Sequence, residues 1–141
     1  KHKGCEMAEI FIQPLAEAPW QNSSPERIKI GANPNTRWRL LVDATHRDSH
    51  GLSVGYGKIP VGEDLPLHSH APQEVYFITQ GNGLLLMKDE KVRDIAKGDS
   101  VYIPENEPHG VKNTGTCDLE FLFVFPGDSW SEIEYNFKNK P

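Results

Sequence analysis

The segment GEDLPLHSHAPQEVYFITQG, residues 62–81, holds three potential metal ligands at short, regular intervals. His68 and His70 are separated by one residue, and Glu74 follows four residues after His70. Alternate residues of an extended strand lie on the same face. The two imidazoles therefore point the same way, and the carboxylate can close a third corner once Ala71-Pro72 bends the chain. The segment predicts facial coordination of a metal ion.

A second segment, GDSVYIPENEPHGVKN at residues 98–113, adds a fourth candidate ligand. His109 follows a polar stretch that contains proline, and a loop between two strands could bring its imidazole opposite the first three ligands. Imidazole and carboxylate ligands that leave coordination positions open suit iron(II), manganese, nickel, cobalt or zinc. The pattern predicts one divalent transition metal and does not by itself choose among these ions.

The rest of the chain has the rhythm of an all-β protein. From Trp38 onward, short stretches rich in valine, isoleucine, leucine, phenylalanine and tyrosine recur between glycine, proline, asparagine and aspartate. Eight short strands suit a closed barrel or sandwich, and the connections at residues 80–83 and 88–91 are short enough for hairpins. Helical turns are expected only at residues 14–17 and 129–135. The expected strands cover residues 38–42, 52–59, 74–79, 83–88, 91–95, 100–103, 110–113 and 119–125.

The chain divides into an N-terminal arm, residues 1–36, and a barrel with a C-terminal segment, residues 37–141. The arm holds one weak apolar segment, residues 8–12, followed by a region rich in proline, asparagine and serine. A chain of 141 residues is about one domain long and can bury a sizeable core. We therefore expect a single barrel domain preceded by an arm.

Composition argues against several kinds of partner. The formal net charge of -5 gives no basic surface that would attract phosphate backbones. The longest apolar run, residues 119–125, contains Glu120 and is far shorter than the roughly 20 residues that span a bilayer. The first twenty residues lack the continuous apolar centre of a secretory signal. We expect no nucleic acid and no membrane partner, a cytoplasmic location, and unpaired thiols at Cys5 and Cys117.

The two histidine segments together resemble the two motifs of the cupin family. Their patterns are G-x5-H-x-H-x3-E-x6-G and G-x5-P-x-N-x2-H-x3-N. Asn106 stands where a glycine is usual, and asparagine tolerates a positive φ. The resemblance implies a single-domain jelly-roll barrel, also called a double-stranded β-helix, and a homodimer to which the arm could contribute a strand. The ligands that it implies are His68, His70, Glu74 and His109.

A narrower resemblance extends over residues 37–135. It rests on RWRLLVD at 37–43, GLSVG at 51–55, the two metal motifs, FPGD at 125–128 and SEIEY at 131–135. These segments are similar to the small cupin lyases that cleave dimethylsulfoniopropionate, most of all to the single-domain type called DddK.

This narrower resemblance implies a reaction, a cofactor and two catalytic residues. The reaction is a β-elimination that releases dimethyl sulfide and acrylate from a small zwitterionic or anionic substrate whose carboxylate binds the metal. Iron(II) or manganese is the favoured ion. Tyr76 and Tyr135 occupy positions that match active-site tyrosines of the family, and a tyrosinate removes the α-proton.

The residues by themselves leave other interpretations open. Tyr76 has the same parity as Glu74, which points its phenol toward the metal, but a core aromatic or a hydrogen-bonding group behind the ligands would fit as well. The alternative functions are an iron(II)-dependent dioxygenase, a sugar-acid isomerase or epimerase, and a non-catalytic ligand-binding protein. His2, His46 and His50 are expected to be surface residues.

Overall fold

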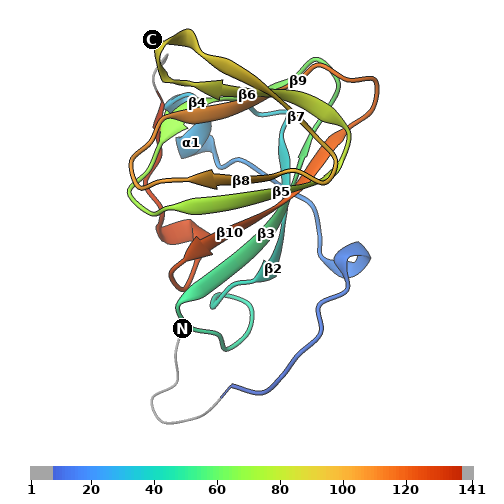
Figure 1. The fold of residues 1–141 in the computed structure, drawn as a ribbon. Helices are drawn as coiled ribbons and strands as arrows, with labels where there is room; N and C mark the ends of the chain where they lie inside the picture. The colour runs from blue at the N-terminus through green and yellow to red at the C-terminus, as the bar shows by residue number, and fades with distance from the viewer. Residues whose placement is uncertain (1–7, 138–141) are drawn as a thin grey trace.

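Two antiparallel sheets packed face to face form a barrel in the computed structural model, which describes residues 8–137 (Figure 1). The larger sheet has the order β1-β2-β3-β10-β5-β8 and the smaller sheet the order β11-β4-β9-β6-β7. The strands of the larger sheet are β1 (Gln21–Asn22), β2 (Arg37–Val42), β3 (Leu52–Ile59), β10 (Leu119–Pro126), β5 (Glu74–Gln80) and β8 (Ser100–Ile103). Those of the smaller sheet are β11 (Asn136–Phe137), β4 (Asp64–Ser69), β9 (His109–Asn113), β6 (Asn82–Met87) and β7 (Val92–Ala96). The prediction of an all-β jelly-roll barrel is confirmed.

Helix is scarce among the described residues. One short helix, α1 (Pro25–Lys29), is capped by the Ser24 side chain, which accepts a hydrogen bond from the Arg27 backbone N–H. Single 3₁₀ turns occur at Leu15–Glu17, Lys88–Glu90 and Trp130–Glu132. The turns expected at residues 14–17 and 129–135 are therefore present, whereas α1 was not expected. No helix in this part of the chain is long and apolar enough to span a bilayer.

All eight expected strands are present, with ends shifted by at most one residue. The hairpin expected at residues 88–91 is confirmed by the antiparallel pairing of β6 with β7. The hairpin expected at residues 80–83 is wrong, because β5 and β6 belong to different sheets. Gly81, at φ 86°, lies where the chain crosses from one sheet to the other, and a Cβ atom there would be 2.9 Å from the Asp118 carbonyl oxygen.

The core lies between the sheets and is rich in phenylalanine. Along β10, Phe121, Phe123 and Phe125 point inward at alternate positions and are almost completely buried. The rings of Phe123 and Phe121 fill the space over Gly55 and Gly57 of the neighbouring strand β3. A side chain at Gly55 would collide with the Phe123 ring, since its Cβ atom would lie 2.1 Å from that ring. These glycines are thus part of the core packing.

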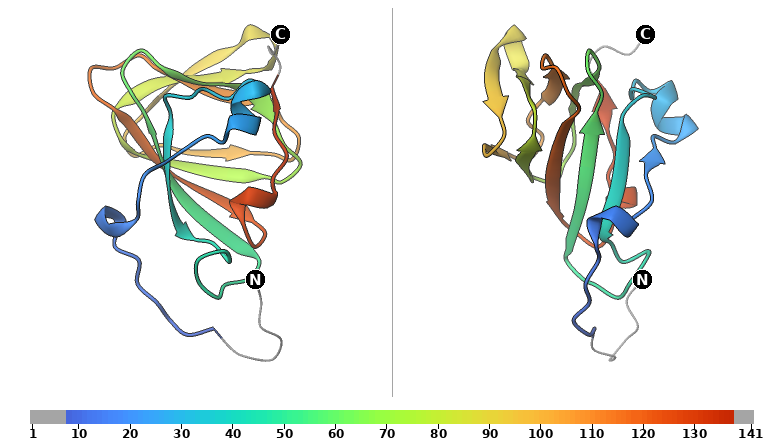
Figure 2. Two further views of the ribbon diagram at one scale, coloured as in Figure 1. Left: turned by 180° about the vertical axis from the view of Figure 1, so that it is seen from behind. Right: turned by 90° about the vertical axis from the view of Figure 1, so that its right-hand side faces the viewer.

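The described part of the N-terminal segment runs along the outside of the barrel before it joins the larger sheet. Strand β1 pairs with β2, and α1 lies beside the C-terminal strand β11 in the left-hand view of Figure 2. At the end of α1, Gly31 packs against Phe137 so closely that a Cβ atom would be 2.7 Å from the Phe137 Cβ atom. The residue that follows α1 and the end of the described chain therefore meet on one side of the barrel. The division at residue 36 stays a prediction.

Candidate metal centre

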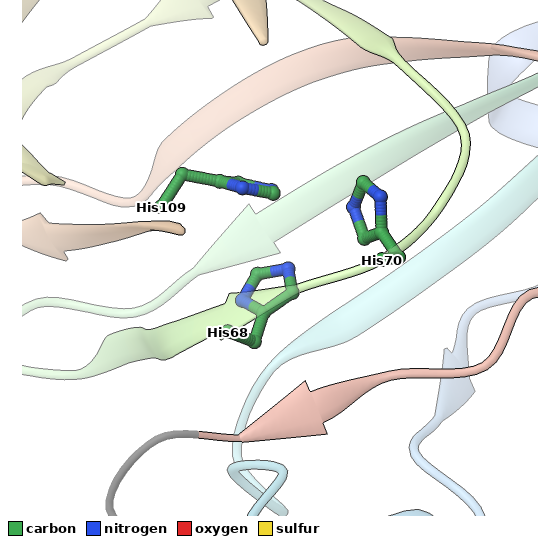
Figure 3. A group of neighbouring side chains, drawn as sticks. All are labelled: His68, His70 and His109. Atoms are coloured by element: carbon green, nitrogen blue, oxygen red, sulfur yellow. The ribbon is translucent and has the colours of Figure 1, made fainter. Parts of the chain in front are cut away.

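Three histidines from two parts of the chain meet inside the barrel (Figure 3). His68 lies near the end of β4, His109 begins β9, and the two are direct cross-strand partners. His70 follows β4 directly, where the chain leaves the smaller sheet. One nitrogen from each imidazole lies within 4.8 Å of the others, and all three side chains are buried. The structure thus brings together the three histidines that the sequence singled out.

Hydrogen bonds fix the orientation of all three imidazole rings. The Nδ1 atoms of His68, His70 and His109 lie 2.7 Å, 2.9 Å and 2.8 Å from the carbonyl oxygens of residues 66, 72 and 107 respectively. A carbonyl oxygen can only accept, so each Nδ1 carries the hydrogen and each neutral ring keeps its lone pair on Nε2. This is the usual way in which proteins set the tautomer of a histidine that binds a metal through Nε2.

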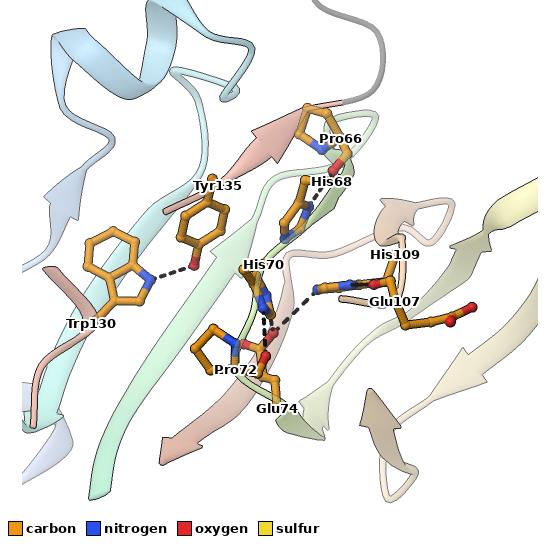
Figure 4. A network of polar contacts seen from close by, with 9 residues as sticks. All are labelled: Pro66, His68, His70, Pro72, Glu74, Glu107, His109, Trp130 and Tyr135. Carbon is orange, nitrogen blue, oxygen red and sulfur yellow. Dashed lines mark hydrogen bonds and ion pairs between the residues drawn. The ribbon is translucent and has the colours of Figure 1, made fainter. Parts of the chain in front are cut away.

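Glu74, the first residue of β5, places its carboxylate against two of these lone pairs (Figure 4). Its Oε1 atom lies 3.1 Å from Nε2 of His70 and 3.3 Å from Nε2 of His109. Although this second distance is short, His109 Nε2 is buried and has no hydrogen-bond partner. Two acceptors that face each other without a hydrogen between them repel, and a cation bound to both removes the repulsion.

The donor set therefore fits a divalent transition metal. Ligand atoms that each lie about 2.1 Å from one ion at right angles are about 3 Å apart, which is close to the separations between Glu74 and the two histidines. Nitrogen donors and one carboxylate suit iron, manganese, cobalt, nickel or zinc. The residues that would hold such an ion are His68, His70 and His109, whose ligand nitrogens lie within 4.8 Å of one another. Glu74 contacts two of these nitrogens and would be the fourth ligand.

The burial of the centre keeps His68 neutral. Its side chain is 1% exposed. Burial lowers the pKa of His68 well below the usual 6.5, and the positive charges that His109 and His70 carry when protonated lower it further. A neutral imidazole is the form that binds metal, so the site favours this form at neutral pH.

Asn106 fixes the conformation of the loop that precedes β9 and carries the chain to His109. Asn106 has φ 63°, a left-handed conformation that asparagine adopts more readily than most residues. Its backbone N–H donates to the His70 carbonyl oxygen at 2.9 Å, which joins the two loops that carry ligands. The expectation that asparagine replaces glycine at a position of positive φ is confirmed.

Tyr76 lies on the same side of β5 as Glu74. The strand alternates buried and exposed residues from Glu74 to Ile78, and Tyr76 is 1% exposed. Its ring centroid is 6.0 Å from that of His109 and 4.8 Å from that of Phe121. Burial raises the pKa of Tyr76 well above 10, and the negative charges of Glu74 and of ionised Tyr135 act in the same direction. The Tyr76 ring thus lies against both His109 of the centre and Phe121 of the core, and its role stays a prediction.

Tyr135 approaches the centre from the C-terminal segment. Its ring stacks on His68, with centroids 5.1 Å apart and planes inclined by 25°, and it meets the edge of His70 at 5.3 Å. The indole Nε1–H of Trp130 donates to the Tyr135 hydroxyl oxygen at 2.7 Å (Figure 4). Burial raises the pKa of Tyr135 above its usual value of 10, with the Glu74 charge acting in the same direction and the Trp130 hydrogen bond opposing it.

Sequence reasoning missed the residues that anchor this C-terminal segment. Asp43 accepts hydrogen bonds from the Ser129 hydroxyl and the Trp130 backbone N–H, both at 3.1 Å. Arg27 of α1 donates to the carbonyl oxygens of Trp130 and Ile133. These residues lie far from Tyr135 in sequence. The sequence holds one indication of such an anchor, the carboxylate of Asp43 directly after an apolar strand. It holds none for Arg27.

The remaining polar candidates lie away from the centre. His46 is exposed, and His50 is an exposed residue whose Nδ1 lies 3.1 Å from the Asp128 carboxylate. Cys117 is exposed and forms no disulfide. His2 and Cys5 lie outside the described residues.

Comparison with known proteins places this site in a family. The sequence profile of the cupin domain matches residues 55–125, which hold all four candidate ligands and Tyr76. The chain is 32% identical over 101 residues to the dimethylsulfoniopropionate lyase DddW of Ruegeria pomeroyi, covering 72% of this chain and 65% of that protein. It is 36% identical over 125 residues to the lyase DddQ of the same organism, covering 85% of this chain and 60% of that protein.

A structural comparison agrees on the fold. The crystal structure of DddQ from Ruegeria pomeroyi superposes with a TM-score of 0.70 and 23% identity, over 89% of this chain and 63% of that one. The chain therefore spans about 60 to 65% of the length of the two curated lyases that it matches.

Proposed function

The chain belongs to the cupin domain family, and on this premise we propose that it is a metal-dependent carbon–sulfur lyase acting on dimethylsulfoniopropionate, of the small DddK type. One observation carries the proposal: two buried phenols, Tyr76 and Tyr135, flank the group of His68, His70, Glu74 and His109. A base beside a carboxylate-binding ion is what an elimination requires.

The metal, when bound, would hold the substrate carboxylate and acidify the neighbouring C–H group. Tyr76, in its ionised tyrosinate form, takes up the α-proton and becomes a neutral phenol. The electron pair of that C–H bond forms the new Cα=Cβ bond, the Cβ–S bond breaks, and neutral dimethyl sulfide leaves with acrylate as the second product. The sulfonium is a good leaving group and needs no proton from the protein. The proton on Tyr76 then passes to water.

The two tyrosines differ in ways that suit different roles. The Tyr135 oxygen already accepts a hydrogen bond from Trp130, which fixes the direction of its own hydrogen toward other partners. This hydrogen bond also favours the ionised form of Tyr135. We assign Tyr135 to orient the substrate, and assign the base to Tyr76 because it follows the candidate ligand Glu74 by two residues on the same strand. Burial and the negative charge of Glu74 raise the pKa of Tyr76. A divalent ion bound to the Glu74 carboxylate would counteract the effect of that negative charge. The aromatic faces around the centre also suit the sulfonium cation.

Headspace detection of dimethyl sulfide, with acrylate measured in the same sample, tests the proposal. Protein loaded with iron(II) or manganese should release the two products in equal amounts without oxygen, and a chelator should stop the reaction. Fully metallated protein that releases neither product would refute the lyase. Oxygen-dependent turnover of other substrates would then support a dioxygenase, and isomerase assays or simple ligand binding would test the remaining alternatives.

A further inference from the structure

Arg27 of helix α1 packs on Trp130 and Tyr135, two aromatic residues of the C-terminal segment beside the candidate centre. We propose that Arg27 is a positioning residue, which holds residues 129–137 against the barrel and thereby fixes the place of Tyr135 over the metal ligands. The structural part of this inference stands by itself. Its catalytic consequence rests on the function proposed above.

Arg27 uses both the edge and the face of its guanidinium group. Its Nη2 atom donates to the carbonyl oxygen of Ile133 at 2.9 Å and to that of Trp130 at 3.4 Å. The guanidinium carbon lies 4.1 Å from the ring centroid of Trp130 and 4.6 Å from that of Tyr135. Cation–π contacts at such distances are attractive, and more so where water is excluded. Arg27 is half-buried, so these contacts are partly protected from solvent.

Two further contacts connect Arg27 to a metal ligand. The Trp130 indole donates to the Tyr135 hydroxyl at 2.7 Å, and the Tyr135 ring stacks on His68. Arg27 packs on both aromatic rings, so it restrains the indole donor and the phenol together. Figure 4 shows Trp130 and Tyr135 between α1 and the histidines. A displacement of this segment would move the phenol relative to the ligands.

The residue must be arginine for this purpose. A planar guanidinium can donate in its plane to carbonyl oxygens while its face rests on aromatic rings. A lysine ammonium is a compact charge that cannot do both at once. We therefore expect Arg27→Lys to restore only part of what Arg27→Ala loses.

The barrel should fold without Arg27, because other contacts hold both ends of the C-terminal segment. The start of the segment is held by Asp43, through Ser129 and the Trp130 backbone. Its end is held by β11, where Phe137 pairs with His68 of β4. Arg27 restrains only the part between these anchors, so its loss should loosen this part and leave the sheets intact.

Hydrogen–deuterium exchange of the full-length protein tests the structural part, with and without manganese. In Arg27→Ala, the amides of Glu132 and Ile133, which donate to Ser129 and Trp130, should exchange at least tenfold faster, while β5 and β10 stay unchanged. Lys29→Ala is the matched control, since it removes the same charge from an exposed position of the same helix. Unchanged exchange in Arg27→Ala, or an equal increase in Lys29→Ala, would overturn the inference.

Kinetics with dimethylsulfoniopropionate test the catalytic consequence. Arg27→Ala should lower kcat about tenfold to a hundredfold with an unchanged metal content, with partial rescue in Arg27→Lys and normal turnover in Lys29→Ala. Trp130→Phe keeps a ring under Arg27 but removes the indole donor, so it should lower kcat without faster exchange. Normal kcat in Arg27→Ala would refute the consequence. If the wild-type protein releases no dimethyl sulfide, the proposed function fails while the exchange experiment still decides the role of Arg27.

Discussion

Replacing Glu74 with glutamine should have opposite effects on the metal-free and metal-bound protein. The carboxylate faces two Nε2 lone pairs at 3.1 and 3.3 Å, and neither contact has a hydrogen to share when the rings are neutral. Glutamine has nearly the same shape and brings an NH₂ group that can donate to both nitrogens. Each new hydrogen bond contributes about 0.5–1.5 kcal/mol, so the metal-free protein should gain about 1–3 kcal/mol in unfolding free energy.

The metal-bound protein should lose stability relative to the wild type. Glutamine is a neutral and weaker ligand than a carboxylate, and a 100-fold weaker affinity removes about 2.7 kcal/mol of metal-induced stabilisation at a fixed metal concentration. Thermal unfolding with chelator and with excess manganese measures both effects. One kcal/mol corresponds to roughly 3–4 °C in Tm for a chain of this size.

The control for this prediction is Glu105→Gln, which removes the same charge at an exposed position four residues before His109. It should change neither curve appreciably. If Glu74→Gln lowers the Tm of the metal-free protein and leaves the metal-induced shift intact, then Glu74 binds a protonated histidine and is no metal ligand.

Three further predictions concern the surroundings of the centre. The pKa of His68 is lowered in the folded protein, so below about pH 6.5 the unfolded chain binds a proton that the folded protein does not. The unfolding free energy of the metal-free protein should therefore fall with decreasing pH, by up to about 1.4 kcal/mol per pH unit. Urea unfolding at pH 7.5 and at pH 5.5 measures this difference. In Asp43→Asn, an NH₂ group replaces one of the two carboxylate oxygens and faces the hydrogens of either Thr45 or Ser129 and Trp130. The unfolding free energy should fall by about 2–4 kcal/mol in the same assay, because donors then face donors. Asn106→Gly should leave stability and metal binding unchanged, because glycine adopts φ 63° without strain. Asn106→Val should lower the unfolding free energy by about 1–2 kcal/mol and weaken manganese binding measured by calorimetry, because valine is strained at this φ. Equal behaviour of the two variants would contradict this view of the loop.

Much of the fold could be predicted because short stretches rich in β-branched, aromatic and other apolar residues are separated by glycine, proline, asparagine and aspartate. Burial then alternates along a strand such as β10, whose phenylalanines point inward. Strand β4 was missed because its sequence, DLPLHS, contains a proline and ends on two polar residues that serve the site. The hairpin error at residues 80–83 arose because a short connection predicts a turn but not whether the next strand stays in the same sheet.

The candidate site was predicted in its members and only partly in its geometry. Even spacing suggested one strand face. In the structure, His68 lies near the end of β4 in the smaller sheet, Glu74 begins β5 in the larger sheet, and the loop between the two strands carries His70. Parity worked for Tyr76, which shares a strand with Glu74. Arg27 and Trp130 could not be predicted, because their contacts depend on how α1 and the C-terminal segment pack, and no local pattern encodes a contact across 103 residues. The homodimer stays a prediction.

The most direct test of the lyase account compares wild-type protein with Tyr76→Phe at equal metal content. Removing one hydroxyl keeps the ring that packs on Phe121 and His109, so folding and metal binding should be preserved. The account predicts that release of dimethyl sulfide falls by about 10²- to 10⁴-fold, because the base for the α-proton is gone. Turnover close to that of the wild type, from a variant with full metal occupancy, would contradict it.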